Sequence, residues 1–206
     1  MKKQTWLLLP LAVLLLLGCA ACGSSTEPSG APDAPDASVS EAGGSAEPSA
    51  PLALETLCVE FVAAGRGEEE LLQLRGALPE ALIAALKEES VEVGQVSVSF
   101  GTSAEATAAA LESGAVQAGF LPAETFFAHE DRLRAAALEN GGEPSPELCV
   151  LAVRAEEDER LVAALQSALP KLAPVLAHYV PGGDFTVDAD ALDALRQSIE
   201  TAETTE

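Results

Sequence analysis

Residues 96–131 read VSVSFGTSAEATAAALESGAVQAGFLPAETFFAHED, and this stretch decides the fold class. Its first five residues alternate between apolar and serine side chains, the period of two that is typical of a half-buried strand. Ser103 is placed to cap a following helix, and Gly114 stands where a left-handed residue ends such a helix. The mostly apolar residues 115–121 predict a second strand. Because a helical crossover makes its two strands parallel, we predict an α/β fold with a largely parallel sheet flanked by helices.

The order of these features resembles the substrate-binding lipoproteins of phosphate, phosphite and phosphonate ABC transporters. In that family a GTS turn, a helix ending in ALxSG and a segment GFxP followed by a hydroxyl–aromatic pair occur in this order. The corresponding residues here are Gly101–Ser103, Ala110–Gly114, Gly119–Pro122 and Thr125–Phe126. The resemblance extends upstream to a strand at 57–62 and a helix at 71–88, so that it covers roughly 75 residues.

What the resemblance implies is a periplasmic-binding-protein-like (type II) lobe that binds a small oxyanion without covalent chemistry. The oxyanion would be phosphate, phosphite or phosphonate, and the protein partner would be an ABC transporter permease. No cofactor is expected. In the family the ligand lies in a cleft between two lobes.

Five residues are the candidates for contact with that ligand. Thr102 and Ser103 would donate hydrogen bonds to an anionic oxygen at a helix N-terminus, although a plain capping role for Ser103 is the favoured alternative. Thr125 and Phe126 occupy the positions of a hydroxyl residue and a cleft tyrosine. Phe126 lacks the phenolic hydroxyl, and a core or rim aromatic is an equally favoured alternative. Arg66 follows the first strand in the position of a ligand loop, with a solvated surface role as its alternative.

The second half of the chain departs from the family. Where the family places most of a second lobe, this sequence has only the loop ENGGEPSPE after Leu138, so we expect the second lobe to be absent or vestigial. The closing section predicts a buried strand at 148–153, a helix at 156–169 that Pro170 ends or kinks, a short helical segment at 174–179 and a last helix at 188–199. The alternative function is therefore a tethered accessory or protein-interaction domain that keeps the lobe fold without ligand binding.

The N-terminus predicts export and a lipid anchor. Residues 1–22 combine two lysines with an apolar stretch too short to span a bilayer, followed by Cys19, the expected lipidated residue, and Cys22, the alternative. A plain secretory signal or an uncleaved anchor helix is the other interpretation. Residues 23–51 are rich in Ser, Pro, Ala, Gly and acidic residues and predict a disordered tether. A single α/β domain at 52–199 and a frayed tail at 200–206 would then lie on the extracytoplasmic face of the bacterial cell membrane.

The strong acidity limits the partners. The chain carries a formal net charge of −22 at pH 7, and without its two N-terminal lysines it has 9 basic against 33 acidic residues, a net charge of about −24. Such a field repels nucleic acid and anionic lipid, and it opposes capture of an anion unless local donors overcome it.

Other chemistry has little support in the sequence. No nucleophile elbow or phosphate loop is present, so we expect no enzyme activity, and we expect no metal site beyond incidental cation binding at His129–Asp131. Cys58 and Cys149 lie in predicted strands, and they would form a disulfide if those strands were neighbours; two free buried thiols are the alternative.

Overall fold

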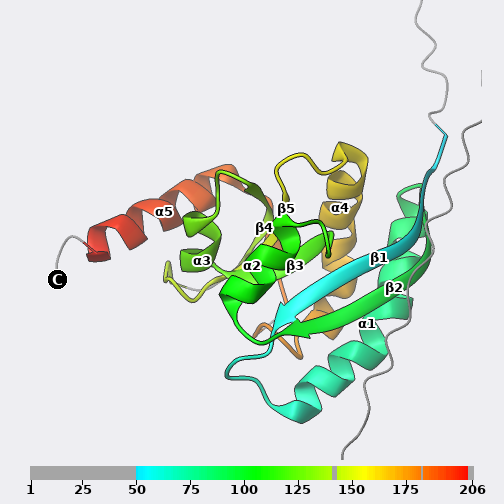
Figure 1. Cartoon of the computed structure of the whole chain (residues 1–206), viewed down its shortest axis with the longest axis horizontal. Helices are drawn as coiled ribbons and strands as arrows, with labels where there is room; N and C mark the ends of the chain where they lie inside the picture. Colours follow the sequence, from blue (N-terminus) through cyan, green and yellow to red (C-terminus); the bar gives the residue numbers. More distant parts are fainter. Residues whose placement is uncertain (1–49, 141–142, 182, 204–206) are drawn as a thin grey trace, which may run out of the picture. The chain divides into compact units, whose positions relative to one another are not determined.

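The structure is a computed structural model that describes residues 50–203 except 141–142 and 182. The predicted signal segment with Cys19 and Cys22, nearly all of the tether and the last three residues lie outside the described residues. Six strands and five helices follow one another in the described part (Figure 1). They are β1 Leu52–Val62, α1 Glu68–Glu88, β2 Val91–Gly101, α2 Ala104–Glu112, β3 Ala118–Pro122, α3 Ala123–Ala128, β4 Leu133–Glu139, β5 Cys149–Arg154, α4 Glu159–Leu176, β6 Phe185–Thr186 and α5 Ala189–Glu203.

The strand–helix–strand prediction at the centre of the chain is confirmed. The Ser103 side chain accepts a hydrogen bond from the Ala106 N–H at 3.1 Å and so caps α2. Gly114 has a φ of +75°, the left-handed conformation that ends a helix at little cost for glycine. β2 and β3 both pair with β1 in parallel, which makes them parallel to each other with β1 between them.

The sheet as a whole is mixed, which corrects the expectation of a largely parallel sheet. Its strand order is β2-β1-β3-β5-β4-β6, and the two pairings of β1 are parallel while the other three are antiparallel. The α/β class with helices flanking the sheet is confirmed. The direction changes at β5, which runs antiparallel to β3 with Cys149 opposite Pro122.

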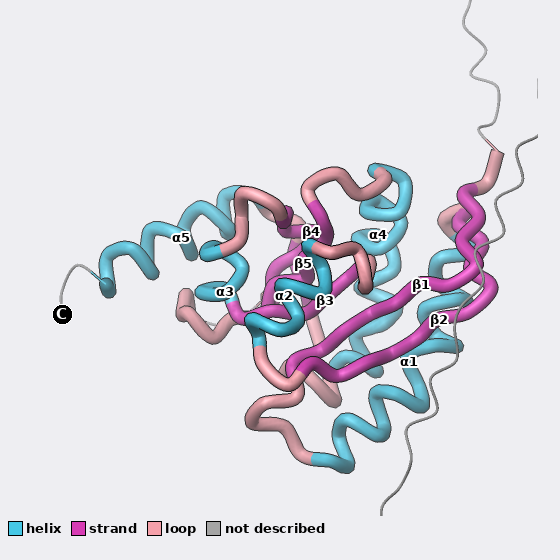
Figure 2. Tube along the Cα trace, in the orientation of Figure 1, coloured by secondary structure: helices cyan, strands magenta, loops and turns pink. Residues whose placement is uncertain are grey.

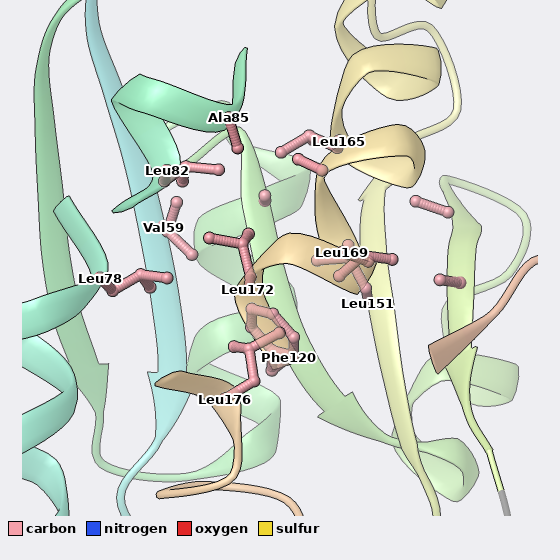
Figure 3. Close-up of a cluster of buried hydrophobic side chains, with 14 of the residues drawn as sticks. Val59, Leu78, Leu82, Ala85, Phe120, Leu151, Leu165, Leu169, Leu172 and Leu176 are labelled. Carbon is pink, nitrogen blue, oxygen red and sulfur yellow. The ribbon is translucent and has the colours of Figure 1, made fainter. Parts of the chain in front are cut away.

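The helices cover both faces of the sheet. The crossover through α1 leads from β1 outward to β2, and the crossover through α2 leads from β2 back past β1 to β3. Because both crossovers have the same hand and run in opposite directions along the sheet, α1 and α2 lie on opposite faces. α1 and α4 share one buried cluster with the sheet, which we call the α1–α4 face (Figure 3). α2, α3 and α5 share the other cluster, which we call the α2–α3–α5 face.

β1 and β2 lie side by side as a long ribbon (Figure 2). The alternation of inward and outward residues breaks partway along both strands. Inward apolar residues step from Leu54 to Leu57 in β1, three positions instead of two, and β2 breaks its period at the same level. The paired register skips Glu55 and Gly94 there. A Cβ on Gly94 would lie 2.8 Å from the Glu55 carbonyl oxygen, so glycine permits the close approach.

Three features differ from the predicted elements. β4 was not predicted; its register shifts between Ala135 and Ala137, and the side chain of Gln166 donates to the Ala136 carbonyl at 2.8 Å. Pro170 does not end the helix, as one of the two predicted outcomes had it, because α4 runs without a break from Glu159 to Leu176. It joins most of the helix predicted at 156–169 to part of the segment predicted at 174–179. α5 continues to Glu203, so the predicted frayed tail is helical over 200–203.

The predicted disulfide option was also wrong. Cys58 and Cys149 are both free. β3 lies between their strands, and strands two positions apart are about 9–10 Å apart, beyond the roughly 7 Å limit between Cα atoms of a disulfide. The two side chains also lie on opposite faces, since Cys149 belongs to the α1–α4 cluster and Cys58 packs against the other.

None of the helices in the described part of the chain is long and apolar enough to cross a membrane.

Candidate functional site

The strand order creates a switch point between β1 and β3. From β1 the chain continues to β2 on one side and then to β3 on the other, so the loops after the two neighbouring strands diverge. In open α/β sheets ligands bind in the crevice outside the carboxyl ends of strands at such a point. We call the segments that follow β1, β2 and β3, residues 63–67, 102–103 and 122–123, the carboxyl edge.

A small hollow of about 70 Å³ lies at this switch point, with room for a few waters or a small ion. β1 and its loop supply one wall, the end of β3 with the start of β5 supplies another, and the segment after α4 closes the side. The lining residues are Val62, Ala64, Arg66, Leu121, Pro122, Glu147, Cys149 and Tyr179.

Tyr179 builds the rigid wall of the hollow. Its hydroxyl accepts a hydrogen bond from the Val62 N–H and donates one to the Val62 carbonyl, each at 3.2 Å. Its ring stands edge-on to Phe61 and Phe120, with centroids 4.8 Å and 6.0 Å away. Burial raises the pKa of the Tyr179 phenol, so that it stays neutral.

Arg66 supplies the cation of the hollow. Its guanidinium carbon lies 4.4 Å from the centre of the Tyr179 ring, a cation–π contact. Six of the nine basic residues in the described part pair with carboxylates. Arg66 has no described carboxylate within 4.0 Å, and the same holds for Arg75, which is stacked on Phe100 at 4.7 Å, and for Lys87. In so acidic a domain, an arginine without an acidic partner keeps its donors available.

Acidic groups limit what the hollow can take. Glu147, exposed at the rim, lines the same hollow as Arg66. Three glutamates, 68–70, fill the first turn of α1, and Glu70 reaches back to the Gly67 N–H at 3.2 Å. These carboxylates complement the positive end of the α1 dipole and leave it unavailable to a ligand anion. A ligand anion must therefore be held at Arg66.

The predicted donors Thr102 and Ser103 lie on the carboxyl edge but do not line the hollow. Both are exposed at the end of β2, and the Ser103 hydroxyl oxygen is used in capping α2. The structure thus confirms the capping role, and it brings these residues to the same edge as Arg66.

Thr125 and Phe126 are core residues rather than cleft residues. They lie in α3, directly after β3, and their exposed fractions are only 9% and 3%. Phe126 packs in the α2–α3–α5 cluster and contacts Phe127 at 5.3 Å between centroids. The expectation that this pair faces the ligand is therefore corrected: the segment reaches the predicted edge, but α3 turns its side chains into the core.

A second polar cluster ties α2 to α3. His129 caps the C-terminus of α3, and its Nδ1 lies 2.7 Å from a Glu112 oxygen while its Nε2 lies 2.9 Å from a Glu105 oxygen. Arg132 also reaches Glu112, at 3.2 Å. The two carboxylates raise the pKa of His129, mainly through their hydrogen bonds, and the bond to His129 lowers the pKa of Glu112.

The surroundings of His129 bear on the incidental cation site considered from the sequence. Among the described residues no group of three or more His, Cys, Asp or Glu side chains could hold a metal ion. The sequence neighbours of His129 turn to other partners, since Glu130 pairs with Arg196 at 2.7 Å and Asp131 lies 3.7 Å from Arg132.

Sequence reasoning missed two residues of the hollow. The sequence places Tyr179 only in a helical segment, although it is the only tyrosine of the chain and follows a strongly apolar helix. Glu147 falls in the loop ENGGEPSPE. Neither position could be tied to Arg66 from spacing alone, because each is brought there by the antiparallel return of the second half.

No family model and no curated protein match this chain. Two solved structures are similar, and their titles name XAC2383 from Xanthomonas citri bound to chloride ion and bound to ATP. The first has a TM-score of 0.53 at 8% identity and covers 73% of this chain and 99% of that chain; the second has 0.52 at 8% identity and covers 73% and 98%. At this identity the likeness concerns the fold alone.

Proposed function

We propose that this protein is a lipid-anchored extracytoplasmic solute-binding protein whose domain has the type II periplasmic-binding-protein-like lobe fold and binds a small oxyanion at the carboxyl edge. The observation that carries the proposal is Arg66, a guanidinium with no carboxylate within 4.0 Å among the described residues, which is held over Tyr179 at the β1–β3 switch point. The anion would be phosphate, phosphite or a phosphonate, and the partner that receives it would be an ABC transporter permease.

The titles of the similar structures add support. Chloride and ATP are both anions, and a domain of similar fold is named as binding each of them. For this chain they suggest an anion site on the same fold. ATP is therefore included among the ligands to be tested, beside the smaller oxyanions.

The start of the described domain and the hollow lie at opposite ends of β1. Leu52 begins the strand and the hollow lies beyond Val62, and an 11-residue strand is about 35 Å long.

The alternative is a membrane-tethered accessory or protein-interaction domain that has lost ligand binding. Two observations favour it: the hollow is only about 70 Å³, and it is exposed to carboxylates at 68–70 and 147. The binding measurement below separates the two functions.

Calorimetric titration of the full chain with phosphate, phosphite, methylphosphonate, sulfate and ATP tests the proposal. We expect saturable heat with at least one anion, and we expect Arg66→Gln to weaken that binding about tenfold or more, because a hydrogen-bonded charge is lost. Arg75→Gln is the matched control, since Arg75 is also stacked on an aromatic ring and forms no ion pair with a carboxylate in the part of the chain that the structure describes. No heat with any anion would leave the interaction domain as the function.

The anchor needs a separate test. Metabolic labelling with an alkyne fatty acid should mark the wild-type chain and the Cys22→Ala variant, but not Cys19→Ala, and only Cys19→Ala should be released from the membrane fraction. Labelling that is lost in Cys22→Ala instead would move the lipid to the alternative cysteine, and an unlabelled wild-type chain would refute the anchor.

A further inference from the structure

The polar cluster at the α2–α3 junction contains a histidine that bridges two carboxylates of one helix. Glu105 lies in the first turn of α2 and Glu112 at its end, and both face His129 at the end of α3. A neutral imidazole carries one N–H, whereas an imidazolium carries two. Each ring nitrogen lies within 2.9 Å of a carboxylate oxygen, so the two acceptors match the two N–H donors of the imidazolium.

We propose that His129 is a pH-sensitive latch between α2 and α3 that controls how strongly the carboxyl edge holds an anion. The identity of the regulated site rests on the proposed function. The latch itself rests on the contacts of His129.

The charged groups around the ring define its response. From α2 come Glu105 and Glu112, and from the segment after α3 come Asp131 and Arg132, with Arg132 bound to both Glu112 and Asp131. From α5 comes Arg196, which is neutralised by Glu130. The groups in direct contact with the ring are both carboxylates, so the cluster favours the charged form of His129 and the pKa of His129 is raised.

Loss of a proton releases one carboxylate. When the pH rises through the raised pKa of His129, one ring nitrogen becomes an acceptor and faces a carboxylate oxygen. Glu112 is 21% exposed and keeps Arg132, whereas Glu105 is 69% exposed and has no other described partner. Glu105 is therefore the carboxylate that turns away into water.

The released carboxylate lies beside the carboxyl edge. Glu105 is two residues from Ser103, the N-cap of α2, where the free N–H groups and the helix dipole favour negative charge. The Ala63 N–H donates to the Gly101 carbonyl at 3.0 Å, so the start of α2 lies beside the loop that carries Arg66. An unpaired carboxylate there adds negative charge at the edge where Arg66 holds the anion, and the positive charge of the ring is lost at the same time. Anion binding should thus weaken with increasing pH.

Sulfate is the probe for the binding arm, because its charge is constant between pH 6.0 and 8.5. In the full chain carrying Trp6→Phe, the fluorescence of Tyr179, the only tyrosine, reports on occupancy of the hollow. We expect the Kd for sulfate to rise about two- to fivefold from pH 6.0 to 8.5 at fixed ionic strength, the range expected for a charge at a helix N-terminus. His129→Gln should bind equally at both pH values, and His178→Gln, the matched control at the other histidine, should keep the wild-type rise.

Several results would overturn the latch. They are a Kd that is equal at the two pH values in the wild-type chain, a pH effect that persists in His129→Gln, and a pH effect that disappears in His178→Gln. Absence of sulfate binding at either pH would instead remove the proposed site, and with it the regulation.

A second measurement does not depend on any ligand. The ring protons of His129 can be titrated by NMR in the full chain, with the His178→Gln variant used for assignment. We expect a midpoint above 6.5 that falls when Glu105→Gln removes one of the two acceptors. A midpoint at or below 6.5, or a midpoint that is the same in Glu105→Gln, would show that the bridge does not form. The latch would then be refuted, while the proposed site could still bind anions.

Discussion

The two faces of the sheet are held by different means. On the α1–α4 face the two helices bury almost only large aliphatic side chains, and these interlock with one another and with the sheet (Figure 3). On the α2–α3–α5 face α2 buries only Thr107, Ala108 and Leu111, and it is fixed by close approach to Gly101 and Gly119 and by the His129 bridge. The comparison teaches that one face supplies stability, while the other can respond to its surroundings.

Thiol reactivity should show the largest contrast between the faces. Cys149 is 5% exposed on the α1–α4 side, and burial raises the pKa of its thiol, whereas Cys58 is half-buried on the opposite side. Because the thiolate is the reactive form, Cys58 should react with a disulfide reagent about a thousandfold faster or more in the native protein. The rates can be compared in Cys58→Ser and Cys149→Ser variants that also lack Cys19 and Cys22; equal rates would contradict the assignment of faces.

Removing a large side chain from the α1–α4 face should have the largest effect on stability. Leu78 is 2% exposed and points from α1 into the cluster (Figure 3). Leu78→Ala should lower the free energy of unfolding by about 2–5 kcal/mol, since it removes buried methyl groups and leaves a cavity. Leu72→Ala on the same helix, at a position 58% exposed, is the control and should cost far less in a urea titration; a cost similar to that of Leu78→Ala would contradict the account.

Disturbing the close packing between α2 and the sheet should have the next largest effect on stability. A Cβ on Gly101 would lie 2.1 Å from the Thr107 hydroxyl oxygen and 2.8 Å from a Glu60 carboxylate oxygen. Gly101→Ala should therefore destabilise the protein by about 1–3 kcal/mol. Gly76→Ala is the matched control, because nothing lies within 4 Å of that Cβ and alanine favours a helix by about 0.5–1 kcal/mol. Equal effects of the two substitutions in thermal unfolding would show that α2 does not approach the sheet closely.

The sequence predicted the face with α2 well because its signals are local. Ser103 and Gly114 mark the two ends of the helix through their own backbone chemistry, and both were placed correctly. The alternation from Val96 to Phe100 is also a local signal. Toward the N-terminus it does not continue past Gly94, where the period of the ribbon breaks, so the predicted strand is shorter than β2.

What failed in the prediction depends on long-range geometry. The type of residue at Thr125 and Phe126 does not reveal that α3 turns them into the core. β4 is not recognisable from the sequence because the bulge at Ala136 breaks the alternation of its side chains. The Ala136 carbonyl accepts a hydrogen bond from the Gln166 side chain in α4, a long-range contact that the sequence does not show. Tyr179 comes to Arg66 only through tertiary packing, which spacing cannot show.

The smallest expected effect is the contribution of the latch to stability. The pKa of His129 is raised in the folded protein, so its contribution is fully present below the ordinary value of 6.5 and is lost as the pH rises through the folded value. The wild-type chain should thus exceed His129→Gln in Tm at pH 6.0 and lose this advantage at pH 9.0, with His178→Gln as the control. An advantage that is the same at both pH values would mean that the ring acts by packing alone.

The most direct test of the central claim is to map anion binding on the 15N-labelled chain by NMR at pH 6.0. With sulfate, the account predicts that the largest amide shifts fall on residues 63–67, beside Arg66, with smaller shifts at 102–104, and that Arg66→Gln abolishes them. Shifts centred instead on Arg132 and Arg154, at the opposite edge of the sheet, or no shifts at any sulfate concentration, would contradict an anion site at the carboxyl edge.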